Sequence, residues 1–225
     1  MAVAIPGARE RLTRAAEELR ACLRRSAGQL TPGQVPEFPL PESPFGDHGR
    51  VPAMWHYSFV ERVRARDARP PRDAYPADLA ARAAALLTAE GWGTPEPRAG
   101  QHGGALVTGA RDGMEITVSV VKGHDEVVYS GRTPEVALYE PVPHVRPEPV
   151  VTEQTLTSGY DLCYECDGLG WCPACEGRGW VLGGRGGWGA GNRPRDPNRL
   201  GLCSLCFAKR FCPICRGAGQ LHPRR

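Results

Sequence analysis

The chain has 225 residues, a formal net charge of +3 and a hydrophobic fraction of 41%, which allows one or two domains and favours neither nucleic acid nor a membrane as a partner. Its longest fully apolar run, from Ala83 to Leu87, is too short to span a bilayer and excludes a membrane-spanning role. Glycine and proline contribute 28 and 22 residues, so we expect a modest core and much irregular chain.

The N-terminal sequence MAVAIPGARERL has only a short apolar run before Pro6 and the charges that follow. A secretory signal peptide needs a longer apolar region, so we expect a cytoplasmic protein. In such a reducing compartment, thiols in regular pairs are more often metal ligands than disulfides.

Residues 1–30 are expected to contain an amphipathic helix over residues 8–27, followed by Gly28 as a stop signal. The apolar residues with helical spacing are Leu12, Ala15, Ala16, Leu19, Cys22 and Leu23. Because Cys22 lies on this apolar stripe, we interpret it as a small buried hydrophobic residue rather than as a ninth metal ligand or a redox thiol.

Residues 31–76 are rich in proline and are expected to be irregular, since proline fits neither a helix interior nor a central strand. Within them, residues 53–66 fit a strand and a helix equally well. Residues 141–160 are expected to be a linker, because the sequence changes in character near residue 150.

Residues 77–140 predict a small α+β domain in which one helix, from residue 77 to residue 91, packs on a three-stranded antiparallel sheet. The strands alternate apolar and polar residues and are separated by tight turns at Asp112-Gly113 and at Gly123. No cluster of histidine and carboxylate side chains has catalytic spacing, so we expect a protein that is not an enzyme.

Residues 161–225 contain eight of the nine cysteines, arranged as four CxxC pairs. The spacing C-x2-C-x5-C-x2-C occurs twice, with 27 residues between the two copies. A CxxC turn points two thiolates at one ion, and two such turns complete the tetrahedral four-sulfur site that Zn²⁺ prefers. We therefore predict a C-terminal β-hairpin and knuckle module that binds two Zn²⁺ ions. Each structural zinc contributes roughly 10–16 kcal/mol of apparent binding free energy, which replaces a large hydrophobic core.

The spacing leaves two ways to pair the cysteine units. In nested pairing the segment folds back as one antiparallel arm with its tip in residues 181–202, and the equal spacing on both sides keeps the two sites in register. In local pairing each tandem pair closes its own site. We favour nested pairing, because five intervening residues form a tight loop for local closure.

Three of the units continue as CxxCxGxG, with glycine at 168 and 170, at 177 and 179, and at 217 and 219. This repeat resembles the cysteine-rich zinc domain of DnaJ-type chaperones over residues 163–220. The resemblance implies that the first and fourth units share one zinc and that the second and third share the other. The implied ligands are Cys163, Cys166, Cys212 and Cys215 at the first site and Cys172, Cys175, Cys203 and Cys206 at the second.

The chain also departs from that family. Its third unit, CSLCFAKR, has Ala208 and Arg210 in place of the two glycines, and the HPD tripeptide of a J-domain does not occur. The barrel-like substrate domains of the chaperones are not recognisable either. The resemblance therefore implies no partnership with an Hsp70-type ATPase.

The module is interpreted as a protein-interaction or chaperone-like adaptor that recognises an unfolded or partner polypeptide. The candidate partner-binding side chains are Trp171, Trp180, Trp188 and Phe211. A first alternative is binding of RNA or single-stranded nucleic acid by the basic tip 183–199, through Arg185, Arg193, Arg195 and Arg199. It is not favoured, because two zincs with eight thiolates bring the charge of the module close to neutral. A second alternative is a thiol–disulfide oxidoreductase that uses the two CPxC pairs, although no thioredoxin-like βαβ pattern surrounds them.

Overall fold

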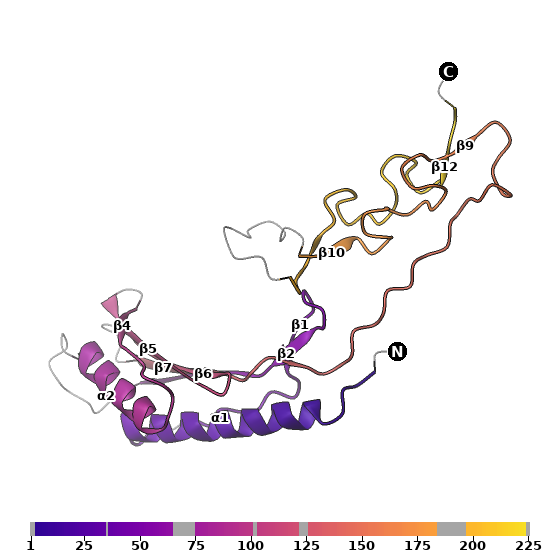
Figure 1. Ribbon diagram of the computed structural model, residues 1–225. Helices are drawn as coiled ribbons and strands as arrows, with labels where there is room; N and C mark the ends of the chain where they lie inside the picture. The colour runs from indigo at the N-terminus through magenta and orange to yellow at the C-terminus, as the bar shows by residue number, and fades with distance from the viewer. Residues whose placement is uncertain are drawn as a thin grey trace. The chain divides into compact units, whose positions relative to one another are not determined.

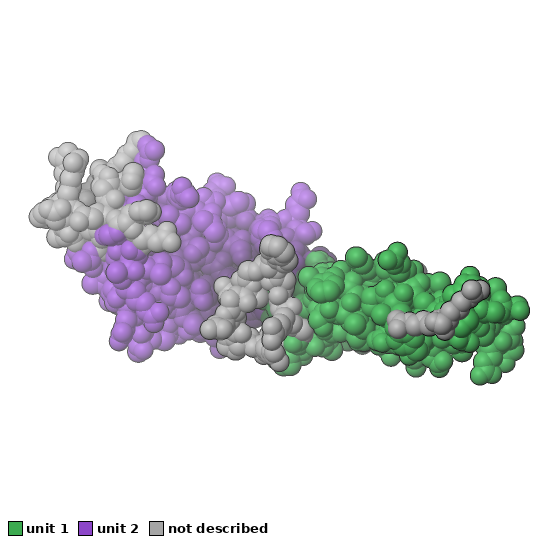
Figure 2. Space-filling view, turned by 90° about the horizontal axis from the view of Figure 1, so that it is seen from above, with its two compact units in different colours: residues 1–3, 48–53, 140–225 green, residues 4–47, 54–139 purple. Residues whose placement is uncertain are grey.

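The computed structural model describes residues 3–34, 36–64, 75–100, 103–121, 126–183 and 197–223 of the chain (Figure 1). The chain divides into two compact units (Figure 2). Unit 1 comprises residues 1–3, 48–53 and 140–225, and unit 2 comprises residues 4–47 and 54–139. No helix in the described part of the chain is long and apolar enough to cross a membrane.

Unit 2 is an α+β domain in which two helices pack on an antiparallel sheet. The helices are α1 (Ala8–Leu30) and α2 (Tyr75–Ala89). The main sheet has the order β3-β7-β6-β5-β4, and its strands are β3 (Ser58–Arg64), β4 (Arg98–Ala99), β5 (Ala105–Arg111), β6 (Met114–Val121) and β7 (Glu126–Arg132). Both helices contact the sheet and each other, and Figure 1 shows them on the same side of it.

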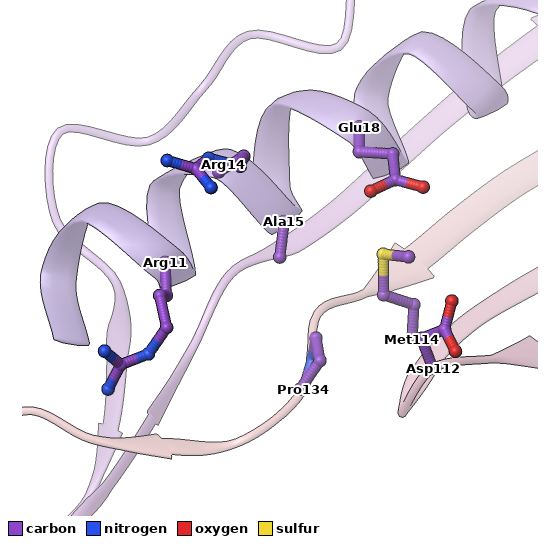
Figure 3. Close-up of a pocket in the computed structure, with 7 residues that line it drawn as sticks. All are labelled: Arg11, Arg14, Ala15, Glu18, Asp112, Met114 and Pro134. Carbon is purple, nitrogen blue, oxygen red and sulfur yellow. The ribbon is translucent and has the colours of Figure 1, made fainter. Parts of the chain in front are cut away.

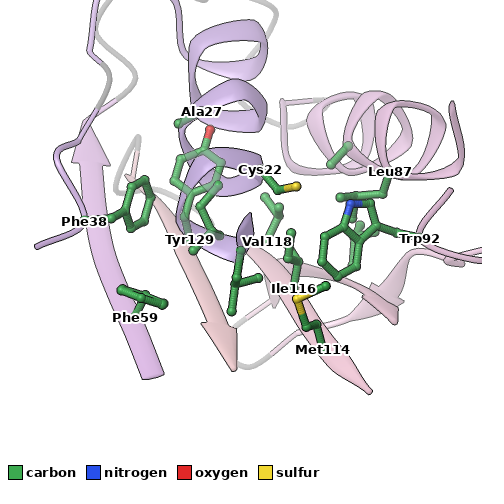
Figure 4. Close-up of a cluster of buried hydrophobic side chains, with 14 of the residues drawn as sticks. Cys22, Ala27, Phe38, Phe59, Leu87, Trp92, Met114, Ile116, Val118 and Tyr129 are labelled. Atoms are coloured by element: carbon green, nitrogen blue, oxygen red, sulfur yellow. The ribbon is translucent and has the colours of Figure 1, made fainter. Parts of the chain in front are cut away.

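The alternation of residues along β6 determines which face of the sheet is covered. Met114, Ile116, Val118 and Val120 are buried, while the residues between them are less buried or exposed. Because successive strand residues point to opposite faces, only one face joins the core, where Figure 4 shows Met114, Ile116 and Val118 beside side chains of the helices. The predicted alternation in the three central strands is confirmed.

Two strand glycines allow the core to pack closely. A Cβ atom at Gly109 would lie 2.8 Å from the Cβ of Trp92, and one at Gly131 would lie 3.0 Å from a methyl carbon of Leu23. Trp92, which follows α2, is fully buried against this position of the sheet (Figure 4). Glycine in these strands therefore serves the close approach of neighbouring side chains.

The turn between β5 and β6 forms as its sequence predicts. Asp112 and Gly113 have φ values of 51° and 75°, and Arg111 pairs with Met114 across the turn. Two central residues with positive φ are typical of the two-residue hairpin turn that matches strand twist. The turn predicted at Gly123 lies outside the described residues.

The segment 31–76 contains more regular structure than its prolines predict. It includes β1 (Phe45–Asp47), β2 (Met54–His56) and β3, and β2 also pairs with β8 (Val136–Ala137). The sheet of unit 2 accordingly has β3 and β4 as additional strands beyond the predicted three. The prediction failed here because β3 pairs with β7, which lies far away in the sequence, and a local pattern does not reveal that pairing.

Unit 1 contains the cysteine units and two short antiparallel strand pairs. These are β9 (Asp161–Leu162) with β12 (Gln220–Leu221), and β10 (Trp180–Leu182) with β11 (Leu200–Leu202). Residues 141–160, predicted as a linker, belong to this unit, and the N–H of Val151 donates to the carbonyl oxygen of Gly168 at 3.1 Å. Part of that segment is therefore packed against the first cysteine unit.

Candidate metal centres

The structure gathers the eight cysteines of the C-terminal region into two groups of four. Group 1 consists of Cys163, Cys166, Cys212 and Cys215, and group 2 consists of Cys172, Cys175, Cys203 and Cys206. The first cysteine unit thus lies with the fourth, and the second with the third. This is the nested arrangement of the units, in which each metal centre takes one CxxC turn from each side of the segment.

The sulfur positions in both groups fit a bound Zn²⁺ ion. The Sγ atoms of each group all lie within 4.8 Å of one another. Across the units, the distances are 3.9 Å for Cys163 to Cys212 and 3.7 Å for Cys172 to Cys203. A Zn–S bond of about 2.3 Å in tetrahedral geometry separates two sulfurs by about 3.8 Å, whereas a disulfide requires about 2.05 Å. All of these cysteines are free, and the two groups fit two Zn²⁺ ions.

Burial of the thiols creates a need for a compensating positive charge. All eight cysteines are at most 7% exposed. Burial raises the pKa of the Cys172 thiol to about 12 and also raises the pKa of Cys166. Burial opposes ionisation of Cys203 as well, but the backbone N–H groups of Cys206 and Leu205 outweigh it and lower the pKa of Cys203 to about 7. A divalent cation stabilises the thiolates together, so metal binding at these groups displaces protons.

Backbone N–H groups that follow the cysteines point at sulfur. Gly170 donates to the Sγ of Cys166 at 3.3 Å, and Gly179 donates to the Sγ of Cys175 at 3.2 Å. Each of these glycines has a positive φ, of 73° and 82° respectively. Glycine adopts this conformation without the steric cost that a Cβ atom adds, which explains the G-x-G that follows the CxxC turn.

The two halves of the cysteine-rich segment repeat the same backbone with a shift of 40 residues. The N–H of Cys163 donates to the carbonyl of Gly219 at 2.9 Å, and the N–H of Cys203 donates to the carbonyl of Gly179 at 3.0 Å. Residues 161–182 are therefore equivalent to residues 201–222, with each half completing the other. Each half hydrogen-bonds to the other in the same way, and each half supplies one CxxC turn to group 1 and one to group 2.

The third unit keeps this backbone although its sequence departs from G-x-G. Ala208 and Arg210 have φ values of 64° and 73°, close to the 79° and 73° of Gly168 and Gly170 at the equivalent positions. A non-glycine residue in this region carries a steric cost of about 1–2 kcal/mol. The hydrogen bonds and sulfur groups of the unit therefore hold these two residues in a conformation that their side chains oppose.

The aromatic residues predicted to bind a partner have different environments. Trp171 is half-buried, packs against group 1 and forms a β-bridge with Phe211. Trp180 and Phe211 are 41% and 37% exposed. Trp188 lies outside the described residues, as do Arg185, Arg193 and Arg195 of the basic tip. The structure places Arg199 at an exposed position just before β11.

Sequence reasoning missed several exposed apolar side chains around the two groups. They are Tyr164, Leu182, Leu205, Phe207 and Ile214. Three of them occupy a middle position of a CxxC turn, where both flanking cysteines point inward to the metal centre. An apolar residue between two ligand cysteines is therefore the sequence signal that could have indicated this surface.

Unit 2 has no comparable group of ligand side chains among its described residues. Cys22 belongs to neither group and is 1% exposed in the core, with the guanidinium of Arg25 donating to its Sγ at 3.0 Å. A pocket lies between α1 and the β5–β6 turn, where Figure 3 shows Arg11 and Arg14 on the helix and Asp112 on the turn. Its side chains of opposite charge and its apolar floor do not form a metal site.

Comparisons of the chain with models of protein families, with curated proteins and with solved structures gave no match. The resemblance of the CxxCxGxG repeat to the zinc domain of DnaJ-type chaperones stays a prediction. The metal centres themselves depend on the cysteine geometry described above.

Proposed function

We propose that the cysteine-rich segment is a two-zinc, DnaJ-like protein-interaction module that recognises an unfolded or partner polypeptide. The observation that carries the proposal is the apolar surface of the module. The exposed fractions are 69% for Tyr164, 55% for Leu182, 72% for Phe207 and 42% for Ile214. Several large apolar side chains exposed on one small segment are typical of sites that bind other proteins.

The metal centres explain how such a surface is maintained. In an ordinary small domain these side chains would be needed for the core, whereas here the two buried cysteine groups occupy the interior. Zinc stabilises the fold, and the apolar side chains stay available to a partner. The module acts as an adaptor or in a chaperone-like way, and its thiols suit a reducing compartment such as the cytoplasm.

A binding role is favoured over a thiol–disulfide oxidoreductase. A reactive dithiol must be accessible to its substrate, and the cysteines of both CPxC pairs are at most 7% exposed. Each pair also shares its group with a second CxxC turn, which matches the four ligands of a structural zinc. We therefore propose that the protein is not an enzyme.

The test uses the full-length, zinc-loaded chain and a reduced, carboxymethylated protein that stays unfolded, with a fluorescent label. We expect saturable binding to the chain and at least a fivefold loss for a variant with Phe207→Ser and Ile214→Ser. Val145→Ser is the matched control, because Val145 is 83% exposed but lies outside the repeat. Absence of binding to the labelled protein, together with absence of any partner in affinity capture, contradicts the proposal.

A further inference from the structure

The two strand pairs of the repeat have equivalent backbones but present different side chains. In the β10–β11 pair, Trp180 lies opposite Leu202 and Leu182 lies opposite Leu200. Residues directly opposite each other, and residues two apart along a strand, share one side of the pair. Val181, on the other side, packs against group 2. All four apolar side chains therefore lie on the side of the pair that faces away from the metal centre.

The equivalent side of the β9–β12 pair is more polar, although Leu162 lies there opposite Gln220. With the shift of 40 residues, Trp180 and Leu182 correspond to Gln220 and His222. Gln220 exchanges two hydrogen bonds with Thr157, at 2.8 and 3.1 Å, and the ring of His222 lies 4.5 Å from that of Tyr160. Of the two pairs, β10–β11 is the one in which all four side chains on this side are apolar.

The free backbone groups of β10 lie on the same residues as its apolar side chains. The N–H of Gly183 donates to the carbonyl of Arg199 at 2.9 Å, which continues the register in which Val181 pairs with Gly201. Backbone groups of alternate residues in an antiparallel pair point to opposite edges, so those of Trp180 and Leu182 point away from β11. Among the described residues, no strand pairs with this edge of β10.

The opposite edge of the pair is already in use. The N–H of Leu200 donates to the carbonyl of Gly49 at 2.7 Å, and the N–H of Val51 donates to the carbonyl of Asn198 at 2.9 Å. The segment 49–51 of unit 1 thus pairs with the chain at the start of β11. An added strand would therefore have to join the pair at β10.

The charge of the module differs between its two ends. Residues 172–183 and 197–210, around group 2, contain four basic side chains and one acidic one. Residues 160–171 and 211–223, around group 1, contain three acidic side chains and one arginine. Arg210 lies close to Gly179, next to β10, because a Cβ atom on that glycine would be 3.2 Å from its Cγ. A zinc ion with its four thiolates adds a charge of −2 to each end, which leaves a net charge of about +1 around group 2 and about −4 around group 1. Of the two ends, the β10–β11 end is therefore the one complementary to an acidic partner.

We propose that the edge of β10 binds an extended, acidic polypeptide segment with alternating apolar residues, which adds to the β10–β11 pair as an antiparallel strand. The backbone of the segment pairs with Trp180 and Leu182, and its apolar side chains lie beside theirs. Its acidic side chains face the basic residues around group 2. The inference rests on the proposed function, since it names the polypeptide chemistry that the module recognises.

The probe is a fluorescein-labelled nine-residue peptide in which valine alternates with glutamate, titrated with the full-length, zinc-loaded chain and followed by anisotropy. One comparison peptide has lysine in place of glutamate, and another is N-methylated at every valine. In an antiparallel added strand whose valines lie opposite Trp180 and Leu182, the valine N–H groups pair with β10, so N-methylation removes the backbone pairing. We expect saturable binding of the glutamate peptide and at least tenfold weaker binding of both comparison peptides.

Two variants test the same edge from the side of the protein. Leu182→Pro removes an N–H group that does not pair with β11, and Leu182→Thr keeps that N–H group but removes the apolar side chain. We expect at least a tenfold loss for the proline variant and about a threefold to tenfold loss for the threonine variant, with two zincs per chain retained. Val145→Thr is the control and is expected to stay within twofold of the unchanged chain. If the proline variant loses zinc, the N-methylated peptide and Leu182→Thr carry the test.

Several results would overturn the inference. Equal binding of the N-methylated peptide rules out strand addition, and equal binding of the lysine peptide rules out an acidic partner. Self-association of the chain that Leu182→Pro abolishes, without peptide binding, identifies a second copy as the occupant. If the unfolded protein binds while the glutamate peptide does not, the inference is wrong and the proposed function stands. If neither binds and affinity capture yields no partner, both are wrong.

Discussion

Substitution of single glycines tests whether the backbone around the cysteines is as tightly packed as the structure indicates. Gly168 and Gly217 both belong to units of group 1 and have φ values of 79° and 94°. A Cβ atom at Gly168 would lie 2.2 Å from the carbonyl oxygen of Val151, whereas the nearest atom to one at Gly217 is 3.6 Å away. The two positions therefore carry a similar conformational cost and a very different steric one.

The magnitudes follow from these contacts. Alanine at positive φ costs about 1–2 kcal/mol, and its smaller freedom in the unfolded chain returns about 0.4–1 kcal/mol. Gly217→Ala should thus lower the free energy of unfolding by about 1 kcal/mol. Gly168→Ala adds overpacking of about 1–3 kcal/mol and loss of the hydrogen bond from Val151, about 1 kcal/mol. We expect a total near 3–5 kcal/mol for that variant.

Thermal unfolding followed by circular dichroism, with zinc release recorded by a colorimetric chelator, measures the difference. Gly168→Ala should release zinc at a clearly lower temperature than Gly217→Ala. Gly177→Ala is a second mild case, because it has the same position in the next unit and its nearest contact is 3.4 Å. If Gly168→Ala and Gly217→Ala agree within about 0.5 kcal/mol, the packing of residues 150–151 on the first unit is wrong.

Three further predictions address the metal centres and unit 2. Metal analysis of the purified chain should give two zincs, and their removal by a chelator should abolish the protease resistance of residues 161–225; one zinc or none contradicts the two groups. Cys163→Ser should release one zinc and make Cys212 and Cys215 reactive to a thiol reagent, whereas reactivity of the second and third units would contradict nested grouping. Burial and then the guanidinium of Arg132 lower the pKa of His56, so its ring should become protonated only below the usual pH range. Arg132→Gln should raise this pKa in an NMR titration; an unchanged value would contradict the assigned contribution of the guanidinium.

The parts of the chain that sequence reasoning predicted are those governed by short-range signals. The spacing of the cysteines defines half-sites within four residues, and the Asp112-Gly113 turn depends on two residues that tolerate positive φ. The helix predicted from residue 77 forms as α2, and the three central strands form as β5, β6 and β7. In each case, the information that fixes the structure lies within a few residues of the element.

The parts that could not be predicted depend on distant segments. Tyr57, Phe59 and Val63 are buried, and their even spacing fits one face of a strand. Trp55, Phe59 and Val63, spaced by four residues, fit a helix as well, so the sequence alone left both open. Pairing of β3 with β7 decides the matter in favour of a strand. Likewise, the packing of Val151 on Gly168 has no signature in the linker sequence, because it depends on the position of the folded cysteine unit.

The exposed side of the β10–β11 pair shows why residue type alone did not distinguish exposed aromatic residues from packed ones. Trp171 and Trp180 occupy equivalent ninth positions of tandem units, yet Trp171 packs against group 1 and Trp180 is 41% exposed. The difference arises because Trp171 lies at the centre of the repeat, opposite Phe211, whereas Trp180 begins a strand at its end. Position within the repeated backbone therefore determines the environment of each aromatic residue.

The same comparison explains how one repeated backbone can have different surfaces at its two ends. Each half must supply two cysteine turns with positive φ after each turn, and even the unit with Ala208 and Arg210 obeys that requirement. This requirement does not apply to the residues that flank the turns, since they are not metal ligands. They are Gln220 and His222 at one end and Trp180 and Leu182 at the other. Because both ends share one backbone, the fold itself requires neither of the two surfaces.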